Sequence, residues 1–137
     1  RGQKKQFKRN KKEYERLSEH IGFYPLVMIS PSDIELILDG SEVRRKFIDS
    51  IISQYDKHYL ETLISYNHAL QQRNALLKYF YENRNFDALS LEIWDDKLAH
   101  FGEIIIDKRN LFLEEFTPFI INHLQSITIL KMYWLLI

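Results

Sequence analysis

The sequence predicts a mainly α-helical protein with a small β part near its N-terminal end. Two long segments, residues 56–83 and 90–119, carry apolar side chains at near-heptad spacing and are joined by a short link. Ahead of them, two polar runs flank Arg9-Asn10, a pattern typical of a weak β-hairpin. Because helices with matching apolar seams and a short connection pack side by side, we expect an antiparallel helical hairpin.

The first thirty residues are expected to hold the β part. The polar hairpin spans residues 4–15, and its polarity places it at an exposed edge. Leu17–Ile21 predicts one helical turn that stops at Gly22. Leu26–Ile29 (LVMI) is short, apolar and rich in β-branched residues, which predicts a buried strand.

From Ser30 onwards the pattern becomes helical. Ser30 or Ser32 is expected to cap a short helix that ends near Leu38, where Asp39-Gly40 breaks it. Ser41 is then expected to cap a second helix with a coherent apolar face. The members of that face are Val43, Phe47, Ile48, Ile51, Ile52 and Tyr55.

Two long helices follow. Asp56 is expected to cap the first, which runs to about Asn83, and Ser90 to cap the second. Pro118 predicts a kink or a break in the second helix unless its neighbours compensate, because proline removes a backbone N–H. The first seam consists of Tyr59, Leu63, Tyr66, Leu70, Arg73, Leu77 and Phe80. The second includes Trp94, Leu98, Phe101, Ile105, Phe112, Phe116 and Phe119.

Charge is distributed unevenly along a chain whose formal net charge is zero. Residues 1–16 hold eight basic and two acidic side chains, a net charge of +6, which leaves −6 for the remainder. A basic arm on an acidic body fits a nucleic-acid contact at one end. A solvated hairpin tip is the alternative interpretation of the same run.

Several classes of site are excluded by what the chain lacks. It has no cysteine, and so neither disulfides nor thiolate metal sites. Its five histidines show no metal-ligand spacing. There is no GxxxxGK[ST] run, and glycine occurs only at positions 2, 22, 40 and 102, so we expect no phosphate cradle and no ATP hydrolysis by this chain alone.

No signal peptide is visible, and the apolar tail, residues 126–137, is shorter than the ~20 residues that span a bilayer. We therefore expect a soluble, cytoplasmic protein that does not bind membranes.

The stretch Ser30–Asp49 (SPSDIELILDGSEVRRKFID) resembles the central signature of the RecF family of SMC-like and ABC-type ATPases. Gln72–Lys78 (QRNALLK) and Trp94–Ala99 (WDDKLA) follow in the order and at about the spacing of that family. The resemblance covers roughly residues 20–125. It implies an internal portion of a larger protein: residues 1–30 as a fragment of a P-loop ATPase β-layer, and residues 31–127 as a helical lid. Residues 128–137 depart from the family pattern, which favours a truncated or frame-disrupted gene product.

The resemblance also implies a function. An intact relative binds ATP with Mg²⁺, dimerises on nucleotide, and binds single-stranded and gapped DNA. With recombination mediator proteins it supports recombinase loading, DNA replication and repair, and the SOS response. No cofactor is expected in this chain itself. Two alternatives are a helical protein–protein interaction module and a non-functional remnant, the latter because a lone short strand is unstable.

Candidate site residues fall into two groups. The predicted DNA-contacting side chains are basic and exposed: Lys8, Arg9, Lys11, Lys12, Arg45 and Lys46. The second group is either structural or placed at the edge of a nucleotide site: Ser30, Arg44, Arg73 and Asn74.

In that second group, Ser30 is expected to serve as a hinge between strand and lid. Arg44 lies in the middle of an apolar face, where it should pair with Asp33, Glu35 or Asp39, or else meet a phosphate. Arg73 lies on the first long seam and must be paired or reach solvent, with Asn74 sharing a helix-packing network.

Overall fold

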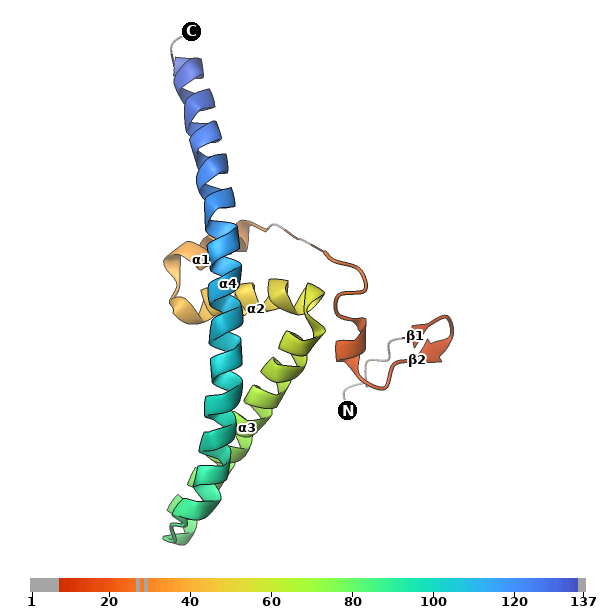
Figure 1. Ribbon diagram of the computed structural model, residues 1–137, viewed down its shortest axis with the longest axis vertical. Coiled ribbons are helices and arrows are strands. Elements are labelled where there is room, and N and C mark those ends of the chain that lie inside the picture. The colour runs from red at the N-terminus through yellow and green to blue at the C-terminus, as the bar shows by residue number, and fades with distance from the viewer. Residues whose placement is uncertain (1–7, 27, 29, 136–137) are drawn as a thin grey trace.

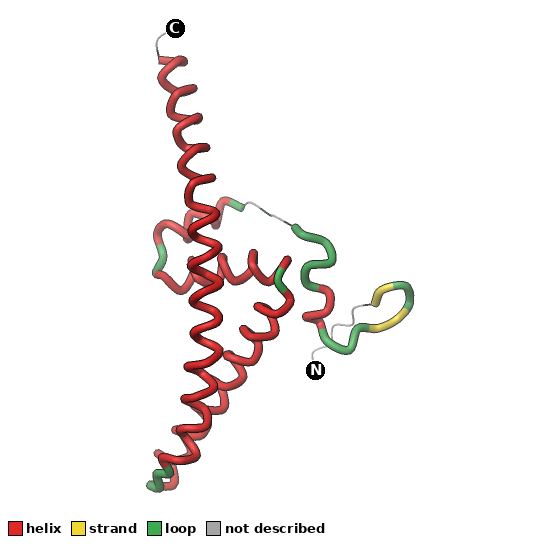
Figure 2. The backbone as a smooth tube through the Cα atoms, viewed as in Figure 1, coloured by secondary structure: helices red, strands yellow, loops and turns green. Residues whose placement is uncertain are grey.

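The structure, a computed structural model, describes residues 8–26, 28 and 30–135. Two long helices, α3 (Lys57–Asn83) and α4 (Ala88–Leu135), form an antiparallel hairpin. A third helix, α2 (Ser41–Tyr55), crosses this hairpin near the open end of α3, and α4 continues well past the crossing (Figure 1). The predicted fold class, mainly α with a small N-terminal β part, is confirmed (Figure 2).

Residues 8–26 form what we call the N-terminal arm. It contains the antiparallel pair β1 (Lys8–Arg9) and β2 (Lys12–Glu13), followed by the 3-10 helix η1 (Leu17–His20). The hairpin turns at Asn10 and Lys11, which both have positive φ, one residue later than predicted. A two-residue hairpin loop of this kind needs positive φ at both central residues, and asparagine tolerates it well. The predicted residues 4–7 of the hairpin lie outside the described residues.

The predicted buried strand at Leu26–Ile29 does not form at its described residues. Leu26 and Met28 belong to no strand and are 72% and 80% exposed, while Val27 and Ile29 lie outside the described part of the chain. A strand needs a hydrogen-bonded neighbour. In the described residues the only sheet is the β1–β2 pair, which makes no ladder with this segment.

The short helical region before α2 consists of the 3-10 helix η2 (Pro31–Ile34) and α1 (Glu35–Leu38). The backbone N–H of Ser30 donates to the Asp33 carboxylate over 2.7 Å, and the Asp33 N–H donates to the Ser30 carbonyl over 3.0 Å. This reciprocal turn starts the helical run at Ser30, as the sequence predicts.

Of the three predicted caps of the longer helices, one is confirmed and two are wrong. The Asp56 carboxylate accepts the Tyr59 N–H over 2.9 Å and caps α3 as predicted. Ser41 is not a cap: Gly40 occupies that position and Ser41 is the first helical residue. At α4, Asp87 takes the role predicted for Ser90, because its carboxylate accepts from the N–H groups of Leu89 and Ser90.

Pro118 does not break α4, which is continuous from Ala88 to Leu135. None of the described helices is both long and apolar enough to cross a membrane.

The core lies where α2, α3 and α4 meet. Ile52, Tyr59 and Ile105, one from each helix, are between 0% and 3% exposed. Half-buried apolar side chains surround them: Ile48, Leu63, Tyr66 and Phe112. The crossing of α2 over the hairpin is therefore an apolar contact at its centre.

Replacing Ile52 with alanine should destabilise the fold by about 2–5 kcal/mol, because it removes buried methyl groups and leaves a cavity beside Tyr59 and Ile105. Urea denaturation followed by circular dichroism measures the change. Ile93→Ala is the matched control, since that side chain is 57% exposed and should change stability by less than about 0.5 kcal/mol. Equal effects of the two substitutions would contradict this placement of the core.

Candidate functional site

The junction of the three helices is held by one carboxylate. Asp49 of α2 accepts two parallel hydrogen bonds, each 2.8 Å long, from Nε and Nη2 of Arg109 in α4. The hydroxyl of Tyr59 in α3 donates to the same carboxylate over 2.5 Å. The Arg109 and Asp49 side chains are 21% and 13% exposed. A bidentate, partly desolvated pair of this kind fixes orientation as well as distance.

Burial and contact with Asp49 shift the ionisation of Tyr59 and Arg109. Burial raises the pKa of the Tyr59 phenol well above its ordinary value, and the hydrogen bond to Asp49 and its negative charge act in the same direction. The hydrogen bond to Asp49 raises the pKa of the Arg109 guanidinium. Tyr59 therefore keeps its proton, and remains a donor, above the pH at which an exposed tyrosine ionises.

A second ion pair stands next to the first. Lys108 Nζ lies 2.7 Å from Oδ2 of Asp56, the residue that caps α3. That hydrogen bond lowers the pKa of the Asp56 carboxyl and raises the pKa of the Lys108 ammonium. Lys108 and Arg109, which are neighbours in α4, thus bind one carboxylate at the α2–α3 corner and one within α2.

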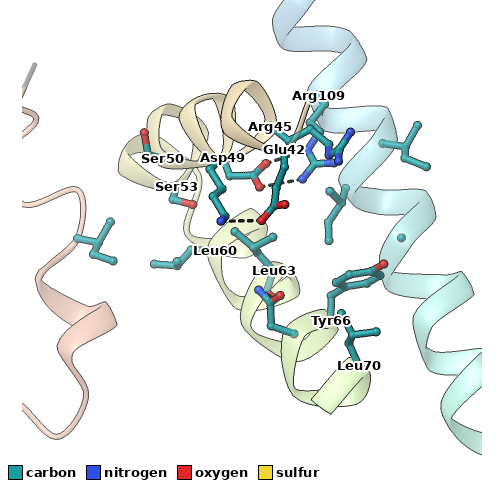
Figure 3. A pocket seen from close by; sticks show the side chains of 16 residues that line it. Glu42, Arg45, Asp49, Ser50, Ser53, Leu60, Leu63, Tyr66, Leu70 and Arg109 are labelled. Carbon is teal, nitrogen blue, oxygen red and sulfur yellow. Dashed lines mark hydrogen bonds and ion pairs between the residues drawn. The ribbon is translucent and has the colours of Figure 1, made fainter. Parts of the chain in front are cut away.

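A groove of about 690 Å³ runs along the side of this junction. Figure 3 shows Asp49 and Arg109 at one end of it, with Leu60, Leu63 and Tyr66 along α3. The predicted DNA-contacting residues Arg45 and Lys46 line the same groove.

Arg45 and Lys46 each have a partner one turn earlier in α2. Arg45 Nη1 donates to the Ser41 hydroxyl over 2.8 Å. Lys46 Nζ lies 2.7 Å from the Glu42 carboxylate, in a pair whose side chains are more than 70% exposed. A pair as exposed as this contributes little stability, so Lys46 can leave it for another anion at low cost.

The hairpin places its basic side chains in solvent. Lys8, Lys11 and Lys12 are exposed, and among the described residues none of them makes an ion pair. Arg9 differs, because its guanidinium carbon lies 3.5 Å from the centre of the Phe23 ring. The predicted group of six is therefore divided between two elements, and within the described structure no hydrogen bond or ion pair joins the hairpin to Arg45 or Lys46.

Arg44 has partners other than the carboxylates expected for it. Its Nη1 donates to the backbone carbonyls of Asp39, over 2.8 Å, and Leu36, over 3.3 Å. It is exposed rather than set into the apolar face of α2. The last carbonyls of a helix lack intrahelical partners and carry partial negative charge, so the end of α1 satisfies this cation without a carboxylate.

Arg73 pairs through Nε with the Asp95 carboxylate and so links α3 to α4. Asn74 is exposed, and no hydrogen bond of its side chain is found among the described residues. Ser30 lies at the start of η2, next to the 26–29 segment.

Sequence reasoning missed the cluster of Asp49, Tyr59 and Arg109. The available signal was weak: Asp49 stands one residue after Ile48, on the edge of the apolar face of α2. Sixty residues separate it from Arg109, and no spacing rule connects the two.

Comparison with known proteins places these features in a family. No protein-family model matches the chain. It is 58% identical over 118 residues to the DNA replication and repair protein RecF of Phocaeicola vulgatus, covering 86% of this chain and 31% of that protein. It is 56% identical over 127 residues to RecF of Flavobacterium johnsoniae, covering 93% of this chain and 35% of that protein. The chain thus spans about a third of the length of these curated relatives.

Solved structures agree with these relatives. The recombination mediator protein RecF-ATP of the RecFOR pathway superposes with a TM-score of 0.71 at 42% identity, over 77% of this chain and 28% of that one. The RecF-ATPrS structure of the same pathway gives a TM-score of 0.69 at 43% identity, with the same coverage.

The raised pKa of Tyr59 predicts a loss of stability in alkali. An unfolded tyrosine ionises near pH 10, whereas folded Tyr59 keeps its proton, so its contribution is complete below pH 10 and declines above it. Between pH 8 and pH 11 this one group should cost about 1.4 kcal/mol of unfolding free energy. Tyr59→Phe should be about 1–3 kcal/mol less stable at pH 8, through loss of its hydrogen bond, and should lose less stability on going to pH 11.

Urea denaturation at the two pH values measures both effects. Tyr81→Phe is the control, because that residue is 87% exposed and should behave as the wild type does. If Tyr59→Phe and the wild type lost the same free energy between pH 8 and pH 11, the assignment of Tyr59 as a buried donor would be wrong.

Proposed function

The chain belongs to the RecF family, and from this premise we propose that it forms the helical lid of a RecF-type DNA replication and repair protein and carries part of its contact with DNA. Within the proposal, residues 1–30 adjoin the ATPase β-layer, residues 31–127 form the lid, and residues 128–137 are a divergent tail. The similarity to RecF-ATP over 77% of the chain supports its place within a RecF-type protein.

The observation that carries the DNA contact is the unpaired charge of the hairpin. At the helix junction, Lys108 and Arg109 are held by the carboxylates of Asp56 and Asp49. Lys8, Lys11 and Lys12 stand exposed without such partners in the described structure. Free ammonium groups on a narrow hairpin suit the phosphate backbone, where each contact releases a condensed counterion and carries no sequence information.

Arg45 and Lys46 form the second part of the proposed contact. They lie on the groove, whose lining also includes Ile21 of the N-terminal arm. DNA that occupies the hairpin and this rim would replace the weak Lys46–Glu42 pair with a phosphate.

ATP and Mg²⁺ belong, in this proposal, to parts of RecF that the chain does not span, because its sequence has no GxxxxGK[ST] run. Nucleotide-dependent dimerisation, contact with mediator proteins, recombinase loading and the SOS response are then properties of a whole RecF protein in the cytoplasm. The lid contributes to them through DNA and partner contacts.

Binding to gapped duplex and to single-stranded DNA should be salt-dependent. Fluorescence anisotropy at 50–300 mM salt should give a log–log slope that becomes shallower by about 2–3 when Lys8, Lys11 and Lys12 are all changed to alanine, because up to three phosphate contacts disappear. The matched control changes Lys57, Lys78 and Lys97, three exposed lysines of α3 and α4, to alanine and should leave the slope unchanged. Charge reversal of Arg45 and Lys46 should weaken binding equally for all sequences.

Two results would overturn the proposal. One is an affinity for gapped duplex at low salt no greater than that of an acidic control protein. The other is equal loss of binding in the hairpin and control variants. Turnover of ATP by this chain above background would overturn the assignment of nucleotide chemistry to other parts of RecF.

A protein-binding function is the second candidate, favoured by the closed end of the α3–α4 hairpin. Tyr81, Phe86 and Leu89 are there 87%, 66% and 74% exposed, which is unusual for large apolar side chains so close together. Changing all three to serine should leave DNA binding intact and abolish co-purification with the other proteins of the RecFOR pathway. If the triple variant kept both DNA binding and co-purification, this candidate function would be ruled out.

A further inference from the structure

We propose that Gly22 and Gln54 form a joint that holds the N-terminal arm against α2 and so positions Lys8, Lys11 and Lys12. Gly22 and Gln54 are positioning residues, acting on DNA only through the hairpin. The inference rests on the proposed DNA contact of the hairpin and adds to it the element that aims the hairpin.

The first half of the joint is a close approach of two backbones. Gly22 has φ +82°, a region that favours glycine. A Cβ at this position would lie 2.2 Å from the carbonyl oxygen of Gln54 and 3.1 Å from its carbonyl carbon. Both obstructing atoms are backbone atoms of a helix, so they cannot rotate aside. Only glycine fits here without moving the arm.

The second half of the joint is the Gln54 side chain. Its Oε1 accepts the backbone N–H of Leu26 over 2.9 Å, across 28 residues of sequence. Its Nε2 donates to the Ser50 carbonyl over 3.3 Å, which orients the amide along α2. One residue in the last turn of α2 therefore holds the arm on both sides of the 23–25 segment.

Contacts within the arm connect the hairpin to residues 20–23, so the hairpin should move together with Gly22. Arg9 stacks over Phe23, the residue next to Gly22, at 3.5 Å. Tyr14 and His20 meet edge to face with ring centres 5.5 Å apart, and the Phe23 N–H donates to the His20 carbonyl over 3.2 Å. Because cation–π and aromatic contacts tie both ends of the hairpin to residues 20–23, a change in the joint is transmitted to the lysines.

The chain has no cysteine, which allows a direct distance measurement. Spin labels are placed at Glu13→Cys in β2 and Glu103→Cys in α4, two exposed positions. Pulsed electron paramagnetic resonance without DNA should give a narrow distance distribution. Gly22→Ala should broaden or shift it. Gly40→Ala should not, because nothing lies within 4 Å of a Cβ at Gly40, whose φ is −68°.

Gln54 gives an independent variant in case Gly22→Ala folds poorly. Gln54→Leu removes the acceptor for Leu26 and should broaden the distribution, whereas Gln54→Glu keeps a side-chain oxygen that can accept this N–H and should leave the distribution narrow. Helical circular dichroism should be the same in Gly22→Ala as in the wild type, because the arm contains no α-helix. It should also be the same in Gln54→Leu, because leucine forms a helix as readily as glutamine does. In DNA titrations, Gly22→Ala and Gln54→Leu should make the salt slope shallower by about 1–2, as one or two phosphate contacts are lost.

The outcomes separate the joint from the DNA contact. An unchanged distribution in both Gly22→Ala and Gln54→Leu overturns the joint, whatever the DNA affinity. A broadened distribution with an unchanged salt slope overturns its positioning role. If the wild-type chain shows no salt-dependent DNA binding while Gly22→Ala still broadens the distribution, the proposed function fails and the joint stands.

Discussion

The carboxylate of Asp49 is the constraint on which the arrangement of the three helices depends. An apolar core such as Ile52, Tyr59 and Ile105 is not directional and would tolerate several crossing angles of α2. The paired hydrogen bonds from Arg109 and the third from Tyr59 select one of them. Partial burial strengthens this selection, because each group left without its partner would be charged or polar and poorly solvated. That crossing angle sets the position of the groove. It also sets the position of the last turn of α2, which the N-terminal arm contacts.

Local features of the structure could be predicted from the sequence. The Asp56 cap and the end of α3 at Asn83 depend on residues within one or two turns of each other, so local propensity determines them. Features that depend on distant segments could not be predicted. The Asp49–Arg109 pair joins residues sixty positions apart, and the acceptors of Arg44 are backbone carbonyls that no sequence pattern marks.

The incorrect local predictions have different physical origins. Ser90 and Asp87 are both good capping residues, and in the structure the Asp87 carboxylate accepts the backbone N–H groups of Leu89 and Ser90. Leu26 and Met28 belong to an apolar run with strand propensity, but propensity alone forms no strand without a neighbouring strand. For the candidate site, the basic hairpin could be identified from composition. The different environments of its exposed lysines and of Arg9 could not, because the contact of Arg9 with the Phe23 ring is visible only in the structure.

The unequal lengths of the two hairpin helices have a mechanical consequence. At about 1.5 Å per residue, the 48 residues of α4 extend about 72 Å and the 27 residues of α3 about 40 Å. Most of the difference projects past the crossing of α2 (Figure 1). A tilt of about 5° at the junction would move a point about 30 Å along this projection by roughly 3 Å. Pro118 lies in α4 and leaves the carbonyl one turn before it without a backbone donor, which makes the helix easier to bend at that point.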